Sequence, residues 1–448
     1  MSIIFSDITV EEFAKLLKES NSPSLICGNG LSINFEPSLS LKCLGEAMYS
    51  THTYIMTFSS YKTVSPQMEQ VFLPNYKAAI KHMRKTIHNE DDFTVLFCEA
   101  VEFAKFINNP QISEWIKTNG FSKNLVMGFG PLDYVADLVK QSEQSDSIFC
   151  INYELWTILI YFALIILDAP SSLSANLDSN KFVQAVRISG QRTLGLTNKS
   201  QNDYYSKTYE NGMFIYYRLL LSSNILLTGN GYNVELMSKW STYQKDVLEG
   251  FLNLFNYIMT TNYDLLLEHL TGRPIYHLHG CYTRSPQTVL GQSLGIFVNS
   301  TRYDLSSILI GDYFIAKTFY AITAHMSQKF PTNTKVDFHH EIMEQIIANN
   351  KSDTIVIFGL NVNNDFHIIR NIQVFLEKSK LRQAKVIFCY FNAEDKISFE
   401  RAYESCITYS DELNKYVQEN ISVYTIDSHY ILQHFFVDNE QGKVSSHS

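Results

Sequence analysis

The chain lacks the cysteine pattern of a disulfide scaffold or of a structural zinc site. Its 448 residues include seven cysteines, which are scattered along the sequence, and none of them stands in a C-x-x-C pair. Disulfide frameworks and structural zinc sites both use cysteines in sets with recognisable spacing. We therefore predict free thiols, a cytoplasmic protein and no metal site.

Basic residues do not outnumber acidic residues in this chain. Lysine and arginine number 36 against 45 aspartates and glutamates, and the formal net charge is −9. Surfaces that bind nucleic acid are usually basic, so we expect no direct nucleic-acid binding. The N-terminal stretch MSIIFSDITVEEFAKLL has no positive segment followed by an apolar core, and we expect no signal peptide.

The most hydrophobic stretch of the chain is too short to cross a bilayer. Residues 155–167, LWTILIYFALIIL, are thirteen apolar or nearly apolar residues that end at Asp168. A membrane-spanning helix needs about 20 such residues. The run therefore predicts a buried core helix, and we expect no membrane association.

What the sequence does contain is an alternation of short apolar runs and helical segments. Hydrophobic residues make up 45% of the chain and charged residues 18%, as in a folded globular protein. The apolar runs end in polar or small residues and lie at 24–27, 221–233, 255–264, 274–280, 353–365, 385–392 and 421–428. Short buried strands that alternate with helices are typical of a parallel sheet. The sequence therefore predicts an α/β fold with a Rossmann-like parallel sheet.

The predicted sheet is interrupted along the chain. Residues 1–40 would form its first βα unit, and residues 41–220, which are patterned mainly as helices, would form a large insertion. Residues 221–435 would supply the remainder of the sheet. The polar tail at 436–448 is expected to be disordered.

Two segments carry more specific expectations. Residues 8–20 predict a helix, because Thr9 suits the cap position and Phe13, Leu16 and Leu17 share one face. Residues 285–335 are poorly patterned and predict a loop with short helices.

A glycine turn follows the first predicted strand. Gly28 and Gly30 would allow a tight turn that brings backbone N–H groups and a helix start toward a phosphate. An ordinary turn between strand and helix is the alternative. Ile33 takes the place of the third glycine of the dehydrogenase pattern, and no second strand with a terminal acid follows by residue 55. A hydride-transfer site is therefore disfavoured.

Polar residues end the run at 255–264. In a parallel sheet, ligands bind at the carboxyl ends of the strands, which is where Asn262 and Asp264 would lie. The Asn262 amide both donates and accepts, so it could orient a sugar hydroxyl or a water. Asp264 could face a ligand or simply cap the following helix.

Two histidines alternate in IYHLHG, residues 275–280. His279 would emerge at the strand end, where an imidazole can act as a base near neutral pH. His277 lies two residues deeper and is interpreted as a satisfied core histidine. In the run at 353–365, Gly359 and Asn361 could approach a phosphate or ribose, and Asp365 could accept from ribose hydroxyls or cap a helix.

Taken in order, these four elements resemble the sirtuin family. Sirtuins carry a glycine turn, a T-x-N-x-D strand end, a His-Gly pair and a later glycine strand end. Here these elements are Gly28 to Ser32, Thr260 to Asp264, His279-Gly280, and Gly359 to Asn361. The resemblance covers about a third of the chain and implies a sirtuin-like fold with NAD as the ligand.

The chain also departs from protein-deacylating sirtuins. It has no four-cysteine zinc ribbon, and Asn34-Phe35-Glu36-Pro37 stands where those enzymes carry an Asp-Phe-Arg segment. The T-T-N-Y-D and H-L-H-G forms, with the helical insertion, look more like the sirtuin-like effectors of bacterial antiphage systems such as Thoeris and KongMing. Those effectors hydrolyse NAD in the infected cell.

The resemblance implies an NAD glycohydrolase that cleaves NAD to nicotinamide and ADP-ribose without a metal. Asn262 and His279 would be catalytic. The residues that would bind NAD are Gly28, Asn29, Gly30, Ser32, Asp264, Gly359, Asn361 and Asp365. Because unregulated NAD hydrolysis would harm the host, we expect gating in a homo-oligomer or in a complex with a regulatory defence protein. A non-catalytic module that senses NAD or ADP-ribose and an NAD-dependent deacylase are the alternatives.

Overall fold

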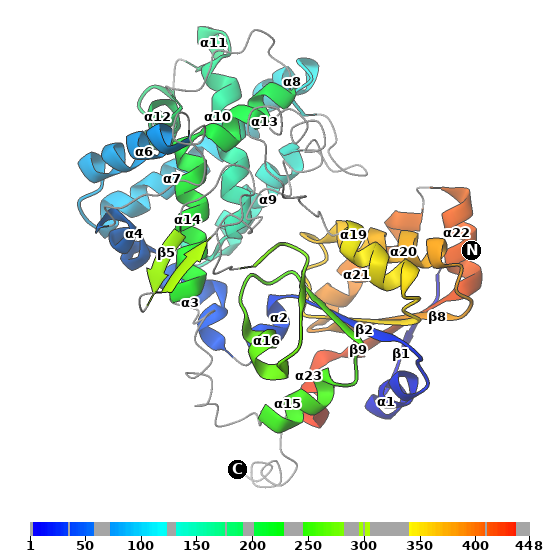
Figure 1. The fold of residues 1–448 in the computed structure, drawn as a ribbon. Coiled ribbons are helices and arrows are strands. Elements are labelled where there is room, and N and C mark those ends of the chain that lie inside the picture. The colour runs from blue at the N-terminus through cyan, green and yellow to red at the C-terminus, as the bar shows by residue number, and fades with distance from the viewer. Residues whose placement is uncertain are drawn as a thin grey trace, which may run out of the picture. The chain divides into compact units, whose positions relative to one another are not determined.

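Within the computed structural model, the contacts of the chain divide it into two compact units. The first comprises Met1–Leu39, Asn230–Gly280 and Asp337–Ser448, and the second comprises Ser40–Gly229 and Cys281–Val336. The structure describes residues 3–34, 36–57, 72–122, 131–174, 177–190, 201–227, 245–281, 295–298, 301–304, 340–407 and 410–435. The first unit carries the sheet and the second is mainly helical (Figure 1).

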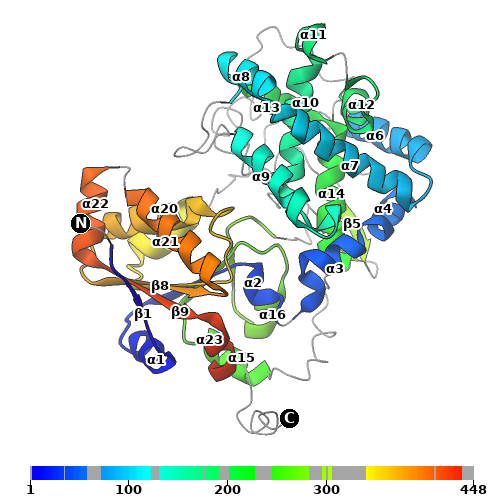
Figure 2. The same cartoon turned by 180° about the vertical axis from the view of Figure 1, so that it is seen from behind.

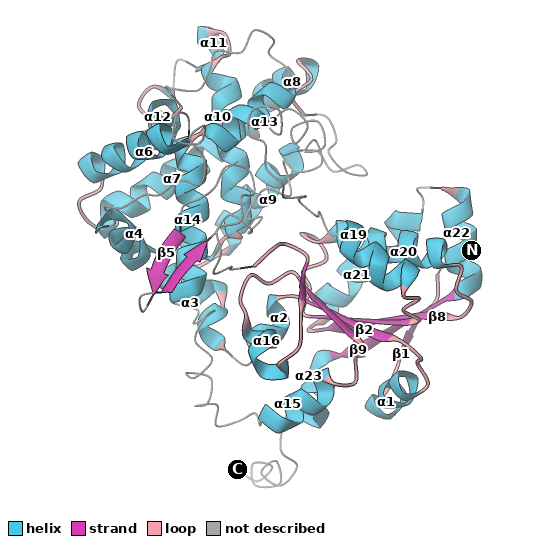
Figure 3. Ribbon diagram, viewed as in Figure 1, coloured by secondary structure: helices cyan, strands magenta, loops and turns pink. Residues whose placement is uncertain are grey.

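The sheet of the first unit has seven strands in the order β1-β9-β8-β7-β2-β3-β4. Figure 3 draws the strands in magenta. Every pairing between neighbouring strands is parallel. The strands are β1 (Phe5–Asp7), β2 (Pro23–Cys27), β3 (Tyr257–Thr260), β4 (Tyr276–His277), β7 (Thr354–Phe358), β8 (Ala384–Tyr390) and β9 (Ile421–Asp427). The predicted Rossmann-like α/β fold is confirmed.

Helices cover both faces of this sheet (Figure 1). One face packs against α1 (Val10–Lys18), α15 (Lys245–Leu252) and α23 (Ser428–Phe435), whose buried residues form one apolar cluster with the strands. On the other face lie α19 (His340–Met343), a π-helical turn (Glu344–Asn349), α20 (Phe366–Ser379), α21 (Ala393–Ile407) and α22 (Asp411–Asn420). Because β2 and β7 are buried on both sides, their sequences are almost continuously apolar.

The direction in which strands are added reverses next to β2. From β2 the chain adds β3 and then β4 on one side, and it later adds β7, β8 and β9 on the other. The neighbours β2 and β7 therefore flank a topological switch point, the place where ligands bind in open parallel sheets. Short helical turns, α2 (Asn29–Ser32), a 3₁₀ turn (Pro37–Leu39) and α16 (Leu266–Thr271), follow the strands near this edge.

The second unit is a helical assembly with one small strand pair (Figure 2). Its helices are α3 (Leu41–Glu46), α4 (Met48–Thr57), α6 (Phe72–Thr86), α7 (Glu90–Ile107), α8 (Pro110–Thr118), α9 (Pro131–Gln144), α10 (Trp156–Leu167), α11 (Ser171–Ser174), α12 (Lys181–Ser189), α13 (Gln201–Glu210) and α14 (Gly212–Leu227), with 3₁₀ turns at Ile148–Cys150 and Tyr153–Leu155. The hydrophobic run at 155–167 forms α10, which is buried along almost its whole length. In the described part of the chain, no helix is both long and apolar enough to cross a membrane.

Two local predictions need correction, and one strand was not predicted. Residues 221–227 belong to α14 and not to a strand, because a short apolar run fits a buried helix as well as a buried strand. The segment expected as a loop with short helices contains the antiparallel strands β5 (Gly295–Val298) and β6 (Thr301–Asp304). The edge strand β1 was not predicted, since three residues carry no readable pattern.

Other predictions are confirmed or fall outside the described residues. The first helix is α1, and Thr9 caps it in a reciprocal arrangement with Glu12. The tail at 436–448, and residues 228–233, 285–294, 299–300 and 305–335 of the predicted segments, lie outside the described residues.

Candidate functional site

The two glycine turns lie against each other at the switch point. The N–H of Gly28 donates to the Phe358 carbonyl at 3.0 Å, and that of Gly30 donates to the Gly359 carbonyl at 2.9 Å. A Cβ on Gly28 would stand 2.5 Å from the Gly359 carbonyl oxygen, and one on Gly30 2.7 Å from the Gly359 Cα. Close backbone packing therefore requires both glycines. Their N–H groups donate to carbonyls of the protein, so the prediction that these N–H groups face a phosphate is wrong.

Gly359 is under a second constraint. Its φ is +65°, and an added Cβ would stand 2.3 Å from the backbone nitrogen of Leu31. Only glycine meets both demands. The helix that follows the first turn, α2, is a single turn of four residues, and Asn29 at its start is exposed. The Asn29 side chain donates to the Leu39 carbonyl at 3.0 Å.

Asn262 is tied to the first glycine turn through Ser32. Its Nδ2 donates to the Ser32 hydroxyl at 2.8 Å, and both residues are buried. Its backbone N–H donates to Oγ1 of Thr260 at 3.1 Å, and that hydroxyl in turn donates to the Cys27 carbonyl at 3.0 Å. The end of β3 and the turn after β2 are thus held in one hydrogen-bonded group.

Asp264 caps the helix that follows it. Its Oδ1 accepts from the backbone N–H of Leu266 at 3.0 Å, at the first residue of α16. This contact supports the capping role that the sequence allowed for Asp264, and it uses one of the two carboxylate oxygens. Burial raises the pKa of this carboxyl to about 6.

His277 is a structural histidine, as predicted. Its Nδ1 lies 2.7 Å from the Asn262 carbonyl oxygen, and its Nε2 contacts Oε1 of Glu268. Burial disfavours the charged imidazole, but the Glu268 carboxylate outweighs burial and raises the pKa of His277. This histidine holds the backbone of the Asn262 turn in place.

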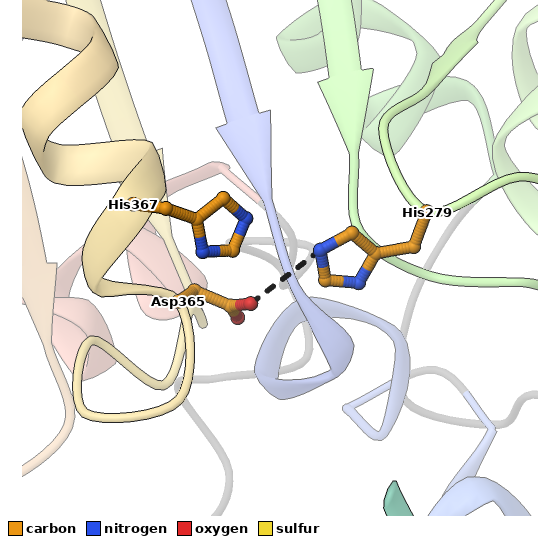
Figure 4. A group of neighbouring side chains, drawn as sticks. All are labelled: His279, Asp365 and His367. Carbon is orange, nitrogen blue, oxygen red and sulfur yellow. Dashed lines mark ion pairs between the residues drawn. The ribbon is translucent and has the colours of Figure 1, made fainter. Parts of the chain in front are cut away.

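His279 occupies a different environment two residues later. The side chain follows the end of β4, is only 5% exposed, and precedes Gly280, whose φ is +80°. Burial lowers the pKa of His279 to about 4, so the imidazole is neutral at pH 7. Its Nε2 lies 3.6 Å from Oδ1 of Asp365 (Figure 4).

Asp365 stands at the cap position of α20 but makes no side-chain cap hydrogen bond. The capping role that the sequence allowed for it is therefore wrong, and the buried carboxylate faces His279 (Figure 4). The α20 start is organised by Asn361, whose main-chain carbonyl accepts from the Asp365 N–H at 2.9 Å. The exposed Asn361 side chain accepts from the N–H of Asn363 at 3.2 Å.

His367 completes this group and was not among the predicted site residues. Its ring stacks on that of His279, with centroids 5.7 Å apart and planes inclined by 20°. One ligand atom each of His279, Asp365 and His367 lies within 4.8 Å of the others, and all three residues are buried. The signal in the sequence was the D-x-H spacing at 365–367.

The structure thus brings the predicted residues to one edge of the sheet. Gly28, Gly30 and Ser32 follow β2, Asn262 follows β3, His279 follows β4, and Gly359 and Asp365 follow β7.

A scan against protein-family models and searches of curated proteins and of solved structures found no match to the chain.

Proposed function

We propose that the protein is an NAD glycohydrolase, which cleaves NAD to nicotinamide and ADP-ribose. The observation that carries the proposal is the meeting of Asn262, His279 and the glycine turns at the carboxyl edge of the parallel sheet, beside its switch point. This is the edge at which open α/β sheets bind nucleotides. The order of the motifs, which resembles that of sirtuin-like NAD hydrolases, supplies the choice of NAD.

The reaction needs a positioned water and a base. The bond between the ribose carbon and the nicotinamide nitrogen would break, and its electron pair would neutralise the pyridinium ring. The oxygen of a water would form the new bond to that carbon while His279 accepts a proton from the water, or from a ribose hydroxyl that activates it. Asn262 would hold the water or the ribose in place.

The two glycine turns would receive the pyrophosphate and the adenosine ribose. The N–H groups of Gly28 and Gly30 are used within the protein, so the contribution of these glycines is a close backbone approach without side chains. Asn29 and Asn361 are exposed and would meet the dinucleotide. The buried Asp264 would lie toward the nicotinamide carboxamide.

The wider role that we propose is that of a gated effector in bacterial antiphage defence, which depletes NAD. That role rests on the resemblance of the motifs. It would require a trigger, supplied by oligomerisation or by a regulatory partner.

A nicotinamide-release assay tests the proposal. Full-length protein, alone and with the products of neighbouring genes, is incubated with NAD, and nicotinamide and ADP-ribose are separated by chromatography. His279→Ala and Asn262→Ala should each lower the rate at least a hundredfold, because they remove the base and the group that orients the water. His429→Gln, at an exposed histidine of the same unit, is the control.

Three outcomes distinguish the alternatives. Full activity in both site variants would refute the assignment of the residues. Thermal stabilisation by NAD without nicotinamide release under any condition would indicate a binding module. NAD consumption that depends on an acetyl-lysine peptide would indicate a deacylase.

A further inference from the structure

His279, Asp365 and His367 form a buried group that we call the His–Asp–His cluster (Figure 4). His279 comes from the end of β4, and the other two residues come from the start of α20. Among the residues that the structure describes, this is the one group of three or more His, Cys, Asp or Glu side chains with ligand atoms so close together. Two imidazoles and one carboxylate are donors that zinc and neighbouring divalent metals accept.

The separations are compatible with coordination. Zinc lies about 2.0–2.1 Å from nitrogen and oxygen ligands, so two ligand atoms of a tetrahedral site stand roughly 3.3 Å apart. Nε2 of His279 and Oδ1 of Asp365 are already 3.6 Å apart. Since all three ligand atoms lie within 4.8 Å of one another, side-chain movements of about 1.5 Å would complete the geometry.

The burial of the cluster distinguishes it from a chance contact. His279, Asp365 and His367 are 5%, 8% and 2% exposed, respectively. A surface pair, Asp427 and His429, has the same D-x-H spacing and an Nδ1–Oδ1 distance of 2.8 Å. His429 is half exposed, and among the described residues the pair belongs to no such group. The carboxylate of Asp365, which does not cap its helix, is directed at an imidazole of another element.

We propose that the His–Asp–His cluster binds a divalent first-row metal ion, with Zn²⁺ as the best fit. One nitrogen of each histidine and one oxygen of Asp365 would be the protein ligands, and a water would take the open position. The metal would be coordinated by the imidazole of His279, which acts as the base in the proposed NAD hydrolysis. Zinc would therefore inhibit that reaction reversibly, and this consequence rests on the proposed function.

Calorimetric titration of ZnCl₂ into tag-free, full-length protein tests the site itself. We expect one ion per wild-type chain, and affinity at least tenfold weaker in Asp365→Asn and in His367→Gln. His429→Gln is the matched control, because it breaks a D-x-H pair that has no third ligand among the described residues, and its zinc affinity should equal that of wild type. Equal affinity in wild type and both cluster variants, or no binding to wild type, would overturn the inference.

The absorption spectrum of the Co²⁺-loaded wild type gives a second test that needs no variant. Histidine and carboxylate ligands give ligand-field bands without the intense thiolate charge-transfer band of a cysteine site. A thiolate charge-transfer band would show that cysteine binds the metal and would overturn the inference. Because the spectrum is recorded on wild type, this test remains valid if a cluster variant fails to fold.

Measurement of nicotinamide release with and without zinc distinguishes a failure of this inference from a failure of the proposed function. Nicotinamide release by wild type should fall at least tenfold with saturating zinc and return with EDTA. Activity without zinc binding would refute the metal site and leave the hydrolase standing. Zinc binding through the cluster without nicotinamide release under any condition would leave the metal site and refute the hydrolase.

Discussion

His277 bridges the main-chain carbonyl of Asn262 and the carboxylate of Glu268. The first contact fixes the turn that carries the Asn262 amide, and the second fixes the imidazole against α16. His277 is thus a positioning residue, while His279, two residues later, faces Asp365. Two histidines only two residues apart, one at the end of β4 and one just after it, therefore have different roles because their partners differ.

The Glu268–His277 pair should make stability depend on pH. The carboxylate raises the pKa of His277, so the pair stabilises the folded state below the unfolded pKa of histidine, and this stabilisation is lost as pH rises through the folded pKa. Glu268→Gln should lower the free energy of unfolding by roughly 1–2 kcal/mol at pH 6 and by less at pH 9. Urea denaturation at both pH values measures the difference, and an equal loss at pH 6 and pH 9 would contradict the assignment.

Ser32→Ala should reduce nicotinamide release about tenfold, because it removes the hydroxyl that orients the Asn262 amide. Ser24 offers a matched control at the other end of the strand, where its hydroxyl bonds that of Ser352 at 2.7 Å. Both serines are fully buried, so each alanine variant should lose about 1 kcal/mol of stability. Equal activity of Ser32→Ala and Ser24→Ala would show that the Ser32 hydroxyl has no role in the reaction.

The sequence predicted the edge of the sheet better than the details at that edge. Strands such as β2 and β7 were recognisable because burial on both faces requires uninterrupted apolar residues. The parallel pairing of β2, β3 and β4 brings Ser32, Asn262 and His279 to one edge. Local sequence does not state whether a carboxylate turns toward its own helix or away from it. Asp264 and Asp365 have similar positions before a helix, yet only Asp264 bonds the helix backbone.

His367 and α14 illustrate two other features that the sequence alone could not predict. His367 meets His279 only because the tertiary fold brings together two histidines that are 88 residues apart in the sequence, which local sequence does not reveal. The run at 221–227 is apolar enough for a strand, but it continues a buried helix of the second unit. In so short a run, the spacing of hydrophobic residues alone cannot distinguish a buried strand from a buried helix.

Gly359→Ala should destabilise the protein strongly. The new Cβ would lie 2.3 Å from the Leu31 nitrogen and would also meet the unfavourable φ of +65°. Gly272→Ala is the matched control, since its φ is +62° and no atom lies within 4 Å of the added Cβ. We expect a loss of about 1 kcal/mol for Gly272→Ala and at least about 3 kcal/mol for Gly359→Ala in urea denaturation. Similar losses would show that the two glycine turns can move apart.

His52 should make the helical unit sensitive to acid. The side chain is 3% exposed, its Nδ1 lies 2.7 Å from the Tyr216 hydroxyl, and burial lowers its pKa to about 4. Below the unfolded pKa of about 6.5 the unfolded chain binds a proton that the folded chain does not, so stability falls as pH drops toward 4. Between pH 7.5 and pH 5 the contribution of His52 should fall by roughly 2 kcal/mol. Urea denaturation of His52→Gln should show a shallower pH dependence than wild type, while His88→Gln, at an exposed histidine of the same unit, should keep the wild-type slope. An unchanged slope in His52→Gln would mean that the folded and unfolded chains bind a proton at His52 equally, and would contradict a lowered pKa in the folded protein.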